Sequence, residues 1–116
     1  MVEGNVPMTE EQVAQIALDF GNRLQGVFAS VELRLFGSYL KNSANRYSDL
    51  DLAVVSPDFA GMETYTAMKI LQRIKLQVNN VIEPIPVTPQ ELASPEMGTL
   101  SYDIAQNSKS VFKAPY

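Results

Sequence analysis

Two stretches of the chain, 9–24 and 64–76, carry apolar residues at the three- and four-residue spacing of an amphipathic helix. In the first stretch, Thr9 and Gln12 have the identity and spacing of a capping box, which predicts where the helix begins. The apolar stripe of this helix consists of Val13, Ile16, Ala17, Phe20 and Leu24. We interpret both helices as contributors to a hydrophobic core.

Three further stretches, 31–36, 49–55 and 81–87, have the alternation or the β-branched composition of strands. The last of them contains Pro84 and Pro86, two residues apart. Both proline rings therefore lie on one side of the strand, where no N–H group is available for pairing. We expect this strand to be an edge strand or a short one.

Shorter elements complete the predicted order. The polar segment 39–47 is expected to form a brief helical turn followed by a loop. A capping pattern at 88–91 predicts the start of a helix, 100–106 predicts the last helix, and 111–112 predicts a short final strand. The mixture of helices and strands predicts a single α/β (α+β) domain over 1–116.

Composition restricts the chemistry of this domain. The chain has 116 residues, 46% hydrophobic and 19% charged, which suits one soluble globular domain. No stretch predicts a membrane span, and the first residues lack the pattern of a secretory signal, so we expect a cytoplasmic protein. Cys and His are absent, so catalysis has to use carboxylates, hydroxyls, Lys or Arg. A net charge of −4 argues against a nucleic-acid partner and favours a compact substrate or a protein.

The candidate catalytic residues lie on the first two predicted strands and in the segment that connects them. Asp49 and Asp51 are two residues apart, so on a strand their carboxylates project from the same face. Such carboxylates repel each other. A divalent cation such as Mg²⁺, whose coordination shell substrate phosphates complete, attracts both carboxylates and so replaces the repulsion by a net attraction. Upstream, Gly37 and Ser38 directly follow a strand, where glycine permits a sharp turn and free N–H groups can face an anion.

The spacing of Gly37-Ser38, ten intervening residues and Asp49-Leu50-Asp51 resembles the DNA polymerase β-type nucleotidyltransferase superfamily, and within it the minimal nucleotidyltransferases. The resemblance covers nearly the whole chain and implies a small mixed β-sheet with helices packed on one side. It implies that Asp49 and Asp51 hold one or two Mg²⁺ ions. It also implies that Gly37 and Ser38 bind the nucleotide of an NTP substrate, with ATP expected.

A third acid on a later strand, flanked by apolar residues, completes the pattern of this family. Glu83 fits it within Ile82-Glu83-Pro84, so the resemblance implies that Glu83 is a third catalytic residue and metal ligand. Asp103 fits the pattern formally, but it falls in a predicted helix and is the weaker candidate. For Ser48 two interpretations remain open, a nucleotide contact and a turn hydroxyl.

The chain departs from the family just after Ser38. Relatives often have a basic residue directly after this serine and a glycine a few positions later, whereas this chain has Tyr39 and then Asn42. Contacts to the triphosphate are therefore less well defined. Lys41 or Arg46 could supply the missing charge, although basic residues on polar loops are more often simply solvated.

The resemblance implies transfer of a nucleoside monophosphate, with AMP expected, to a hydroxyl on a partner protein. Relatives of this kind act with a separate helical HEPN-type protein as antitoxin and toxin, and this chain has no helical domain of its own to hold an acceptor. The alternative is a non-catalytic nucleotidyltransferase-like module that neutralises or regulates its partner by covering it. Homo-oligomerisation is left open.

Overall fold

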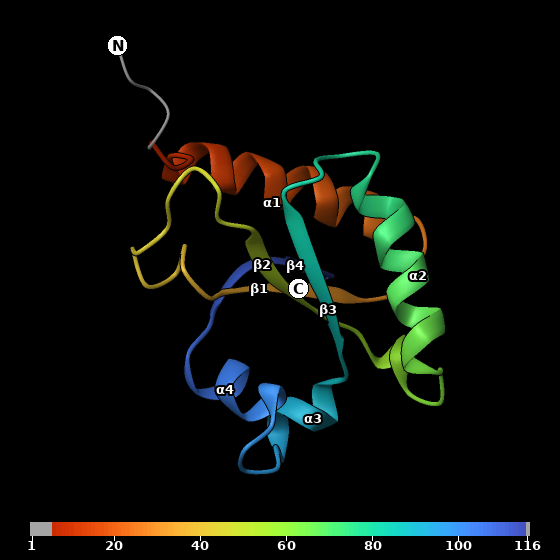
Figure 1. Cartoon of the computed structure of the whole chain (residues 1–116). Helices are drawn as coiled ribbons and strands as arrows, with labels where there is room; N and C mark the ends of the chain where they lie inside the picture. Colours follow the sequence, from red (N-terminus) through yellow and green to blue (C-terminus); the bar gives the residue numbers. More distant parts are fainter. Residues whose placement is uncertain (1–5, 116) are drawn as a thin grey trace.

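A four-stranded mixed β-sheet organises the fold (Figure 1). The computed structural model describes residues 6–115. The expectation that the chain begins without a secretory signal concerns residues 1–5, which lie outside this range. The elements in chain order are α1 (Glu10–Leu24), β1 (Val31–Phe36), β2 (Leu50–Val55), the 3-10 helix η1 (Pro57–Phe59), α2 (Thr64–Lys75), β3 (Ile82–Val87), α3 (Pro89–Ala93), α4 (Leu100–Gln106) and β4 (Lys109–Ala114). The strand order is β3-β2-β1-β4, in which β1 is antiparallel to both neighbours and β2 is parallel to β3.

Local signals explain where the helices begin. The predicted capping box of α1 is present: Thr9 Oγ1 accepts a hydrogen bond from the Gln12 N–H, and Gln12 Oε1 accepts one from the Thr9 N–H. Thr88 and Glu91 form the same reciprocal pair at α3. The predicted helices and strands are confirmed to within one or two residues at their ends. No helix within residues 6–115 is long and apolar enough to cross a membrane.

The segment after β1 contains the brief helical turn that its sequence predicts. The backbone N–H of Lys41 donates to the carbonyl of Gly37 at 3.1 Å, which is a single hydrogen bond of helical type. Asn42 then adopts a φ of 60°, in the left-handed region, and this conformation ends the helical turn at once. The rest of 39–47 is loop, as predicted.

Both faces of the sheet are covered by apolar residues. The larger core lies between the sheet and the helices α1 and α2, and its fully buried side chains include Phe20, Leu24, Leu33, Leu52 and Leu71. A smaller cluster on the opposite face joins the sheet to α3 and α4, and it consists of Phe36, Ala53, Val55, Val87 and Ile104, with Ile85 and Leu92 packed against it. The expectation of helices on one side therefore holds only for the two long helices. β2 is a central strand with buried residues on both faces, so its second face needs a cover as well.

Both edges of the sheet carry features that discourage further strand pairing. β3 is an edge strand, as Pro84 and Pro86 predict, and these residues have no N–H group to offer. On the other edge, the register of β4 shifts at Val111, which leaves a β-bulge. Lys109 and Lys113 add exposed charge to the same strand. A partner is therefore expected to contact a face of this molecule rather than extend its sheet.

Close packing of β4 on α1 requires glycine at position 21. A Cβ atom at Gly21 would lie 2.6 Å from three atoms of the Phe112 ring, so Gly21→Ala should destabilise the protein by about 1–3 kcal/mol. Gly26→Ala is the matched control, because the nearest atom, the Arg23 carbonyl oxygen, lies 3.4 Å away. This control should be neutral or stabilising by up to about 1 kcal/mol. Urea unfolding of both variants tests the difference, and equal destabilisation would contradict it.

Candidate functional site

Two of the predicted acids lie side by side on neighbouring strands. Asp51 and Glu83 are each the second residue of their strands, and the parallel register of β2 and β3 pairs them directly. Neighbouring strands are separated by about 4.8 Å, so the two side chains leave the sheet as close neighbours. Both are half-buried, and they share the face that carries Ala53 and Val87 farther along the strands. The tertiary structure therefore brings together acids that are separated by more than thirty residues.

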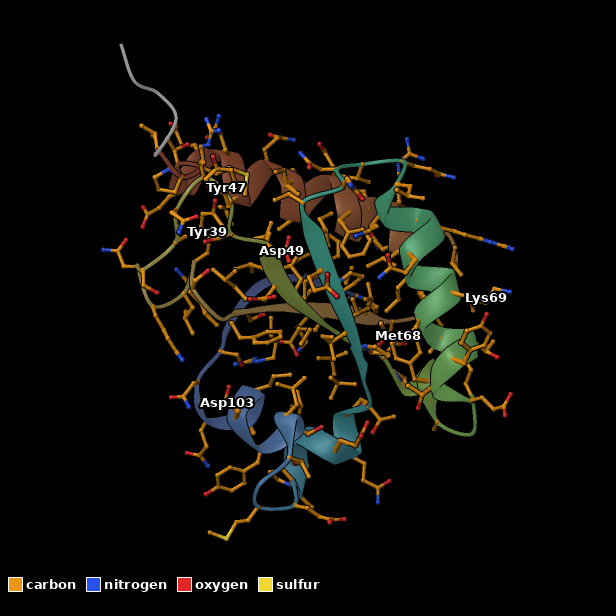
Figure 2. The ribbon with its side chains drawn as sticks, viewed as in Figure 1. Tyr39, Tyr47, Asp49, Met68, Lys69 and Asp103 are labelled. Carbon is orange, nitrogen blue, oxygen red and sulfur yellow. The ribbon has the colours of Figure 1, made fainter. Side chains whose placement is uncertain are left out.

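Asp49 lies just before β2 rather than on it. The strand begins at Leu50, which is fully buried and whose N–H donates to the carbonyl of Val81 at 2.9 Å. This anchor leaves Asp49 exposed at the start of the strand, as Figure 2 shows. The two-residue spacing places Asp49 and Asp51 on the same side of the backbone. Both acids predicted from the second strand are therefore at the same end of the sheet.

The pKa of Asp51 reflects its burial and the two carboxylates beside it. Partial burial raises the pKa of Asp51 above its ordinary value of 3.8, and the negative charges of Asp49 and Glu83 raise it further. Asp103 is not among the charges that act on Asp51. It lies on α4, where the side-chain amide of Asn107 donates to it (Figure 2). This placement agrees with the choice of Glu83 over Asp103 as the third acid.

Gly37 closes the site from the side of β1. Its φ is 77°, in the left-handed region that favours glycine. A Cβ atom here would overlap Oδ2 of Asp51 and would lie 3.0 Å from its Cγ atom. Glycine therefore lets the carboxylate of Asp51 lie directly against the backbone. Among the described residues, the next two N–H groups, those of Ser38 and Tyr39, have no protein acceptor and can face an anion.

The loop that follows is held by its own polar groups. Asn45 and Ser48 close a turn in which the Ser48 N–H donates to the Asn45 carbonyl at 3.0 Å. The Ser48 hydroxyl accepts a hydrogen bond from the Asn45 N–H at 2.9 Å, which confirms its use as a turn hydroxyl. Its own proton is still able to reach a ligand. Arg46 donates to the hydroxyl of Tyr47 at 2.7 Å and stacks over the same ring.

Asn42 resolves one of the departures seen in the sequence. The resemblance leads us to expect a glycine a few positions after Ser38, and Asn42 occupies a left-handed conformation there. Asparagine is the residue type that tolerates this conformation best after glycine. Lys41 and Arg46, the two candidates for the absent basic residue after Ser38, are both exposed loop residues, and their contact with a triphosphate stays a prediction.

Lys75 contributes to the site but was not predicted to do so. Its side chain is 9% exposed, and its ammonium group donates to the carbonyl of Ile82 at 2.9 Å and to that of Asn80 at 3.4 Å. These bonds tie the end of α2 to the beginning of β3, one residue before Glu83. The sequence contains a weak signal, since Lys75 lies four residues after Leu71 on the buried stripe of α2.

Arg34 is a cation on the acidic face whose contacts are with the protein itself. It projects from β1 on the same face as Phe36, and its guanidinium group donates to Glu32 and to both the hydroxyl and the carbonyl of Ser108. These contacts fasten the junction of α4 and β4 to the sheet. Each of its three nitrogens consequently already donates to the protein.

The comparisons with known proteins identify the family. A family model described as a nucleotidyltransferase domain matches residues 13–104, which include β1, β2, β3 and the loop carrying Gly37. The chain belongs to the nucleotidyltransferase domain family. No curated protein matches it.

A solved structure confirms the nucleotidyltransferase fold. The chain is similar to a protein from Sulfolobus solfataricus whose crystal structure, at 1.40 Å resolution, is described as that of a candidate nucleotidyltransferase. The TM-score is 0.69, and the match covers 90% of this chain and 83% of the other. Sequence identity is 16%, so this likeness establishes the fold. Nucleotidyl transfer is accordingly the general chemistry that the family assigns to the domain.

The acids of this nucleotidyltransferase domain fit a divalent cation that substrate phosphates help to hold. Within residues 6–115, no three acidic side chains converge closely enough to form a metal cage by themselves. Mg²⁺ is usually bound by one or two carboxylates together with phosphates and water, and Asp49 and Asp51 are the carboxylates predicted for this role. The raised pKa of Asp51 marks a place where added positive charge is favourable. A direct metal bond to Glu83 stays a prediction.

Gly37 allows a sharp test of the contact with Asp51. Gly37→Ala should destabilise the protein by about 2–4 kcal/mol, because backbone strain and overlap with the carboxylate add together. Gly61→Ala is the matched control, since Gly61 has a φ of 81° but nothing within 4 Å of an added Cβ atom. It should cost only the strain, about 1–2 kcal/mol. Chemical denaturation of Gly37→Ala, of Asp51→Ala and of the double variant gives the coupling energy. Independent, additive effects of the two changes would contradict the proposed contact.

The raised pKa of Asp51 predicts a pH dependence of stability in metal-free buffer. The folded protein holds the Asp51 proton more tightly than the unfolded chain does, so ionisation of Asp51 lowers the free energy of unfolding. The protonated Asp51 therefore contributes to the free energy of unfolding. This contribution is fully present below the ordinary pKa of 3.8 and is lost as the pH rises through the raised pKa. Asp51→Asn should therefore increase Tm at neutral pH, and the increase should vanish in acid. In an Asp49→Asn background the increase should be smaller, and a pH-independent effect would show that electrostatics are not its cause.

Proposed function

We propose that this protein is a Mg²⁺-dependent nucleotidyltransferase that moves AMP from ATP to a hydroxyl group on a partner protein in the cytoplasm. The observation that carries the proposal is the arrangement of Asp51 between Asp49, Glu83 and the backbone of Gly37. It combines clustered carboxylates with unpaired N–H groups at one end of a sheet. Family membership adds the reaction class.

Each residue has a chemical task in this proposal. Asp49 and Asp51 would hold the divalent cation, which neutralises charge on the triphosphate when it is bound. The N–H groups of Ser38 and Tyr39 would donate to phosphate oxygens, and Gly37 permits their close approach. Glu83, half-buried beside Asp51, would accept the proton of the attacking hydroxyl. The bond from the acceptor oxygen to the α-phosphorus forms as the bond to pyrophosphate breaks.

The acceptor is proposed to be a hydroxyl of a separately encoded helical protein of the HEPN type, with this chain as the antitoxin of the pair. Two observations support a protein partner. α3 and α4 pack against the acidic face through a small apolar cluster, and Asp49 at the start of β2 is exposed. Both sheet edges are unsuited to pairing, so a partner would approach this open face. Such a cover would also exclude water from the reaction.

One observation favours a second candidate, a non-catalytic module that neutralises its partner by covering it. The described residues contain no preformed three-acid cage, and the loop cations Lys41 and Arg46 are exposed. A protein of this kind would retain the fold and the partner but would transfer nothing. The two candidates differ in whether the partner gains mass.

Co-expression with the helical partner, followed by incubation with ATP and Mg²⁺ and intact mass measurement, tests the proposal. The partner should gain increments of AMP size, and Asp51→Asn should slow their appearance by at least about 100-fold, since it removes a ligand of the metal. Asp103→Asn is the matched control, because it makes the same change in charge on α4 and should leave the rate nearly unchanged. Glu83→Gln measures the role of the third acid.

The outcomes separate the candidates. A stable complex without mass increments, formed equally well by the Asp51→Asn variant, would support the non-catalytic module. Transfer to a free small molecule in the absence of a partner would contradict the choice of a protein acceptor. Loss of activity in Asp103→Asn but not in Glu83→Gln would reverse the assignment of the third acid.

A further inference from the structure

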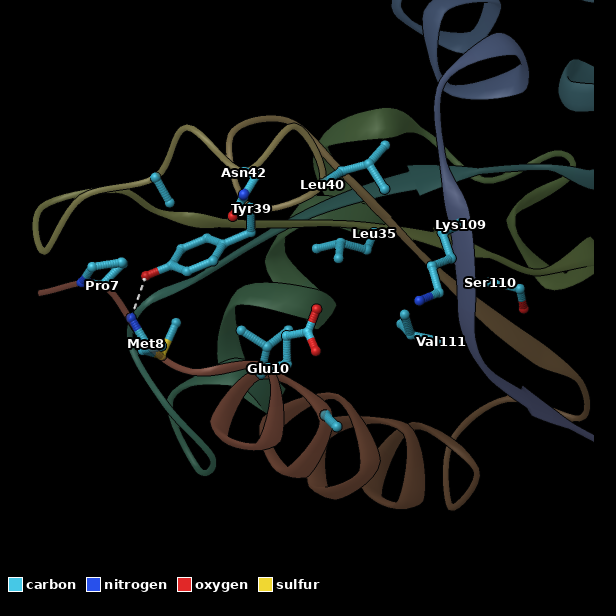
Figure 3. Close-up of a pocket in the computed structure, with 13 residues that line it drawn as sticks. Pro7, Met8, Glu10, Leu35, Tyr39, Leu40, Asn42, Lys109, Ser110 and Val111 are labelled. Carbon is cyan, nitrogen blue, oxygen red and sulfur yellow. Dashed lines mark hydrogen bonds between the residues drawn. The ribbon is translucent and has the colours of Figure 1, made fainter.

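A cavity of about 420 Å³ lies on the face of the sheet opposite to the acids. It is bounded by the first turns of α1, the loop after β1, and the beginning of β4 (Figure 3). Leu35, which lines it, belongs to the core under α1, whereas Phe36 and the acids belong to the other face. The cavity is therefore separate from the proposed transfer site. Its volume falls within the range of small-molecule sites in proteins.

The cavity has an apolar interior and two opposite charges. Val13, Leu35, Leu40 and Val111 contribute aliphatic side chains to its walls. Figure 3 shows the Glu10 carboxylate and the Lys109 ammonium group directed into the space from α1 and from β4. Within residues 6–115 the one ion pair is that between Arg34 and Glu32, so neither of the cavity's charges is paired. Both can therefore act on a bound molecule.

The wall near the N-terminus is fixed by a tertiary hydrogen bond. The hydroxyl of Tyr39 accepts a hydrogen bond from the backbone N–H of Met8 at 3.1 Å, which connects the loop after β1 to the segment before α1 (Figure 3). The Tyr39 hydroxyl proton is free to donate in turn. Asn42, held in its left-handed conformation, adds an amide group to the rim. The fold therefore fixes this wall, while Glu10, Asn42 and Lys109 are exposed residues at the rim of the cavity.

These features point to a ligand with an apolar body and both charges. Phosphates and dicarboxylates are disfavoured, because one lysine is opposed by one carboxylate in the same cavity. A cation without an anionic group would leave Lys109 uncompensated in the same way. We propose that the cavity binds a small apolar zwitterion of the amino-acid class, with its ammonium group toward Glu10 and its carboxylate toward Lys109. This site goes beyond the proposed transfer reaction and does not depend on it.

The proposal is tested with L-leucine as the probe on the whole chain. Its matched analogues are 4-methylpentanoate, which lacks the amino group, and isopentylamine, which lacks the carboxylate. Titration followed by amide NMR should show saturable shifts at Tyr39, Leu40 and Asn42, and none at Gly61 in the distant loop before α2. Each analogue should bind about fivefold more weakly than L-leucine, because each removes one partly exposed ion pair.

Substitutions of the two charged residues test which group of the ligand each of them binds. Lys109→Met should abolish the preference for L-leucine over isopentylamine, and Glu10→Gln should abolish the preference over 4-methylpentanoate. Lys113→Met and Glu11→Gln are the matched controls, since they make the same changes on the same elements but outside the cavity, and both preferences should persist. Absence of saturable shifts would overturn the proposal. Equal binding of all three probes would also overturn it, by showing an apolar hole without recognition of charge.

Discussion

The carboxylate of Asp51 lies against the backbone of Gly37, and the arrangement of the site depends on this contact. The antiparallel register of β1 and β2 sets Phe36 opposite Asp51, so the residue that follows Phe36 must pass directly beside the carboxylate. Any side chain at that position would occupy the space of Asp51 Oδ2. Glycine removes this obstacle and also permits the turn that presents the next two N–H groups. One residue type thus brings hydrogen-bond donors and carboxylate together.

The fold holds like charges together at a cost to its own stability. Covalent spacing places Asp49 near Asp51, and parallel pairing of β2 and β3 adds Glu83, so the backbone positions of Asp51 and Glu83 are fixed by the sheet. The anchor is Lys75, whose buried ammonium group fastens the start of β3 to the end of α2. Strain of this kind is common at functional sites, where a bound cation and substrate relieve it. The charge and the packing of this region therefore support the same chemical interpretation.

The two faces of the sheet serve different purposes. One face packs on the long helices and contains the cavity beside α1, while the other face has the acids at one end and α3 and α4 at the other. The loop from Gly37 to Asp49 reaches both, because Gly37 borders the acids and Asn42 borders the cavity. Each arrangement also uses an edge strand, since Glu83 lies on β3 and Lys109 lies on β4.

The sequence by itself determined the order of the elements, the pair of acids Asp49 and Asp51, and the family resemblance. Helix caps, apolar periodicity and the two prolines of β3 are local signals that act over a few residues, which is why they predict boundaries and the edge position well. Only the tertiary structure decided which distant groups meet. Strand order and register decide four features of the structure. They are the pairing of Asp51 with Glu83, the burial of Lys75, the cover of the second face by α4, and the cavity between Glu10 and Lys109. These are set by packing of the whole chain, because the free energy that selects one register comes from contacts between residues far apart in the sequence.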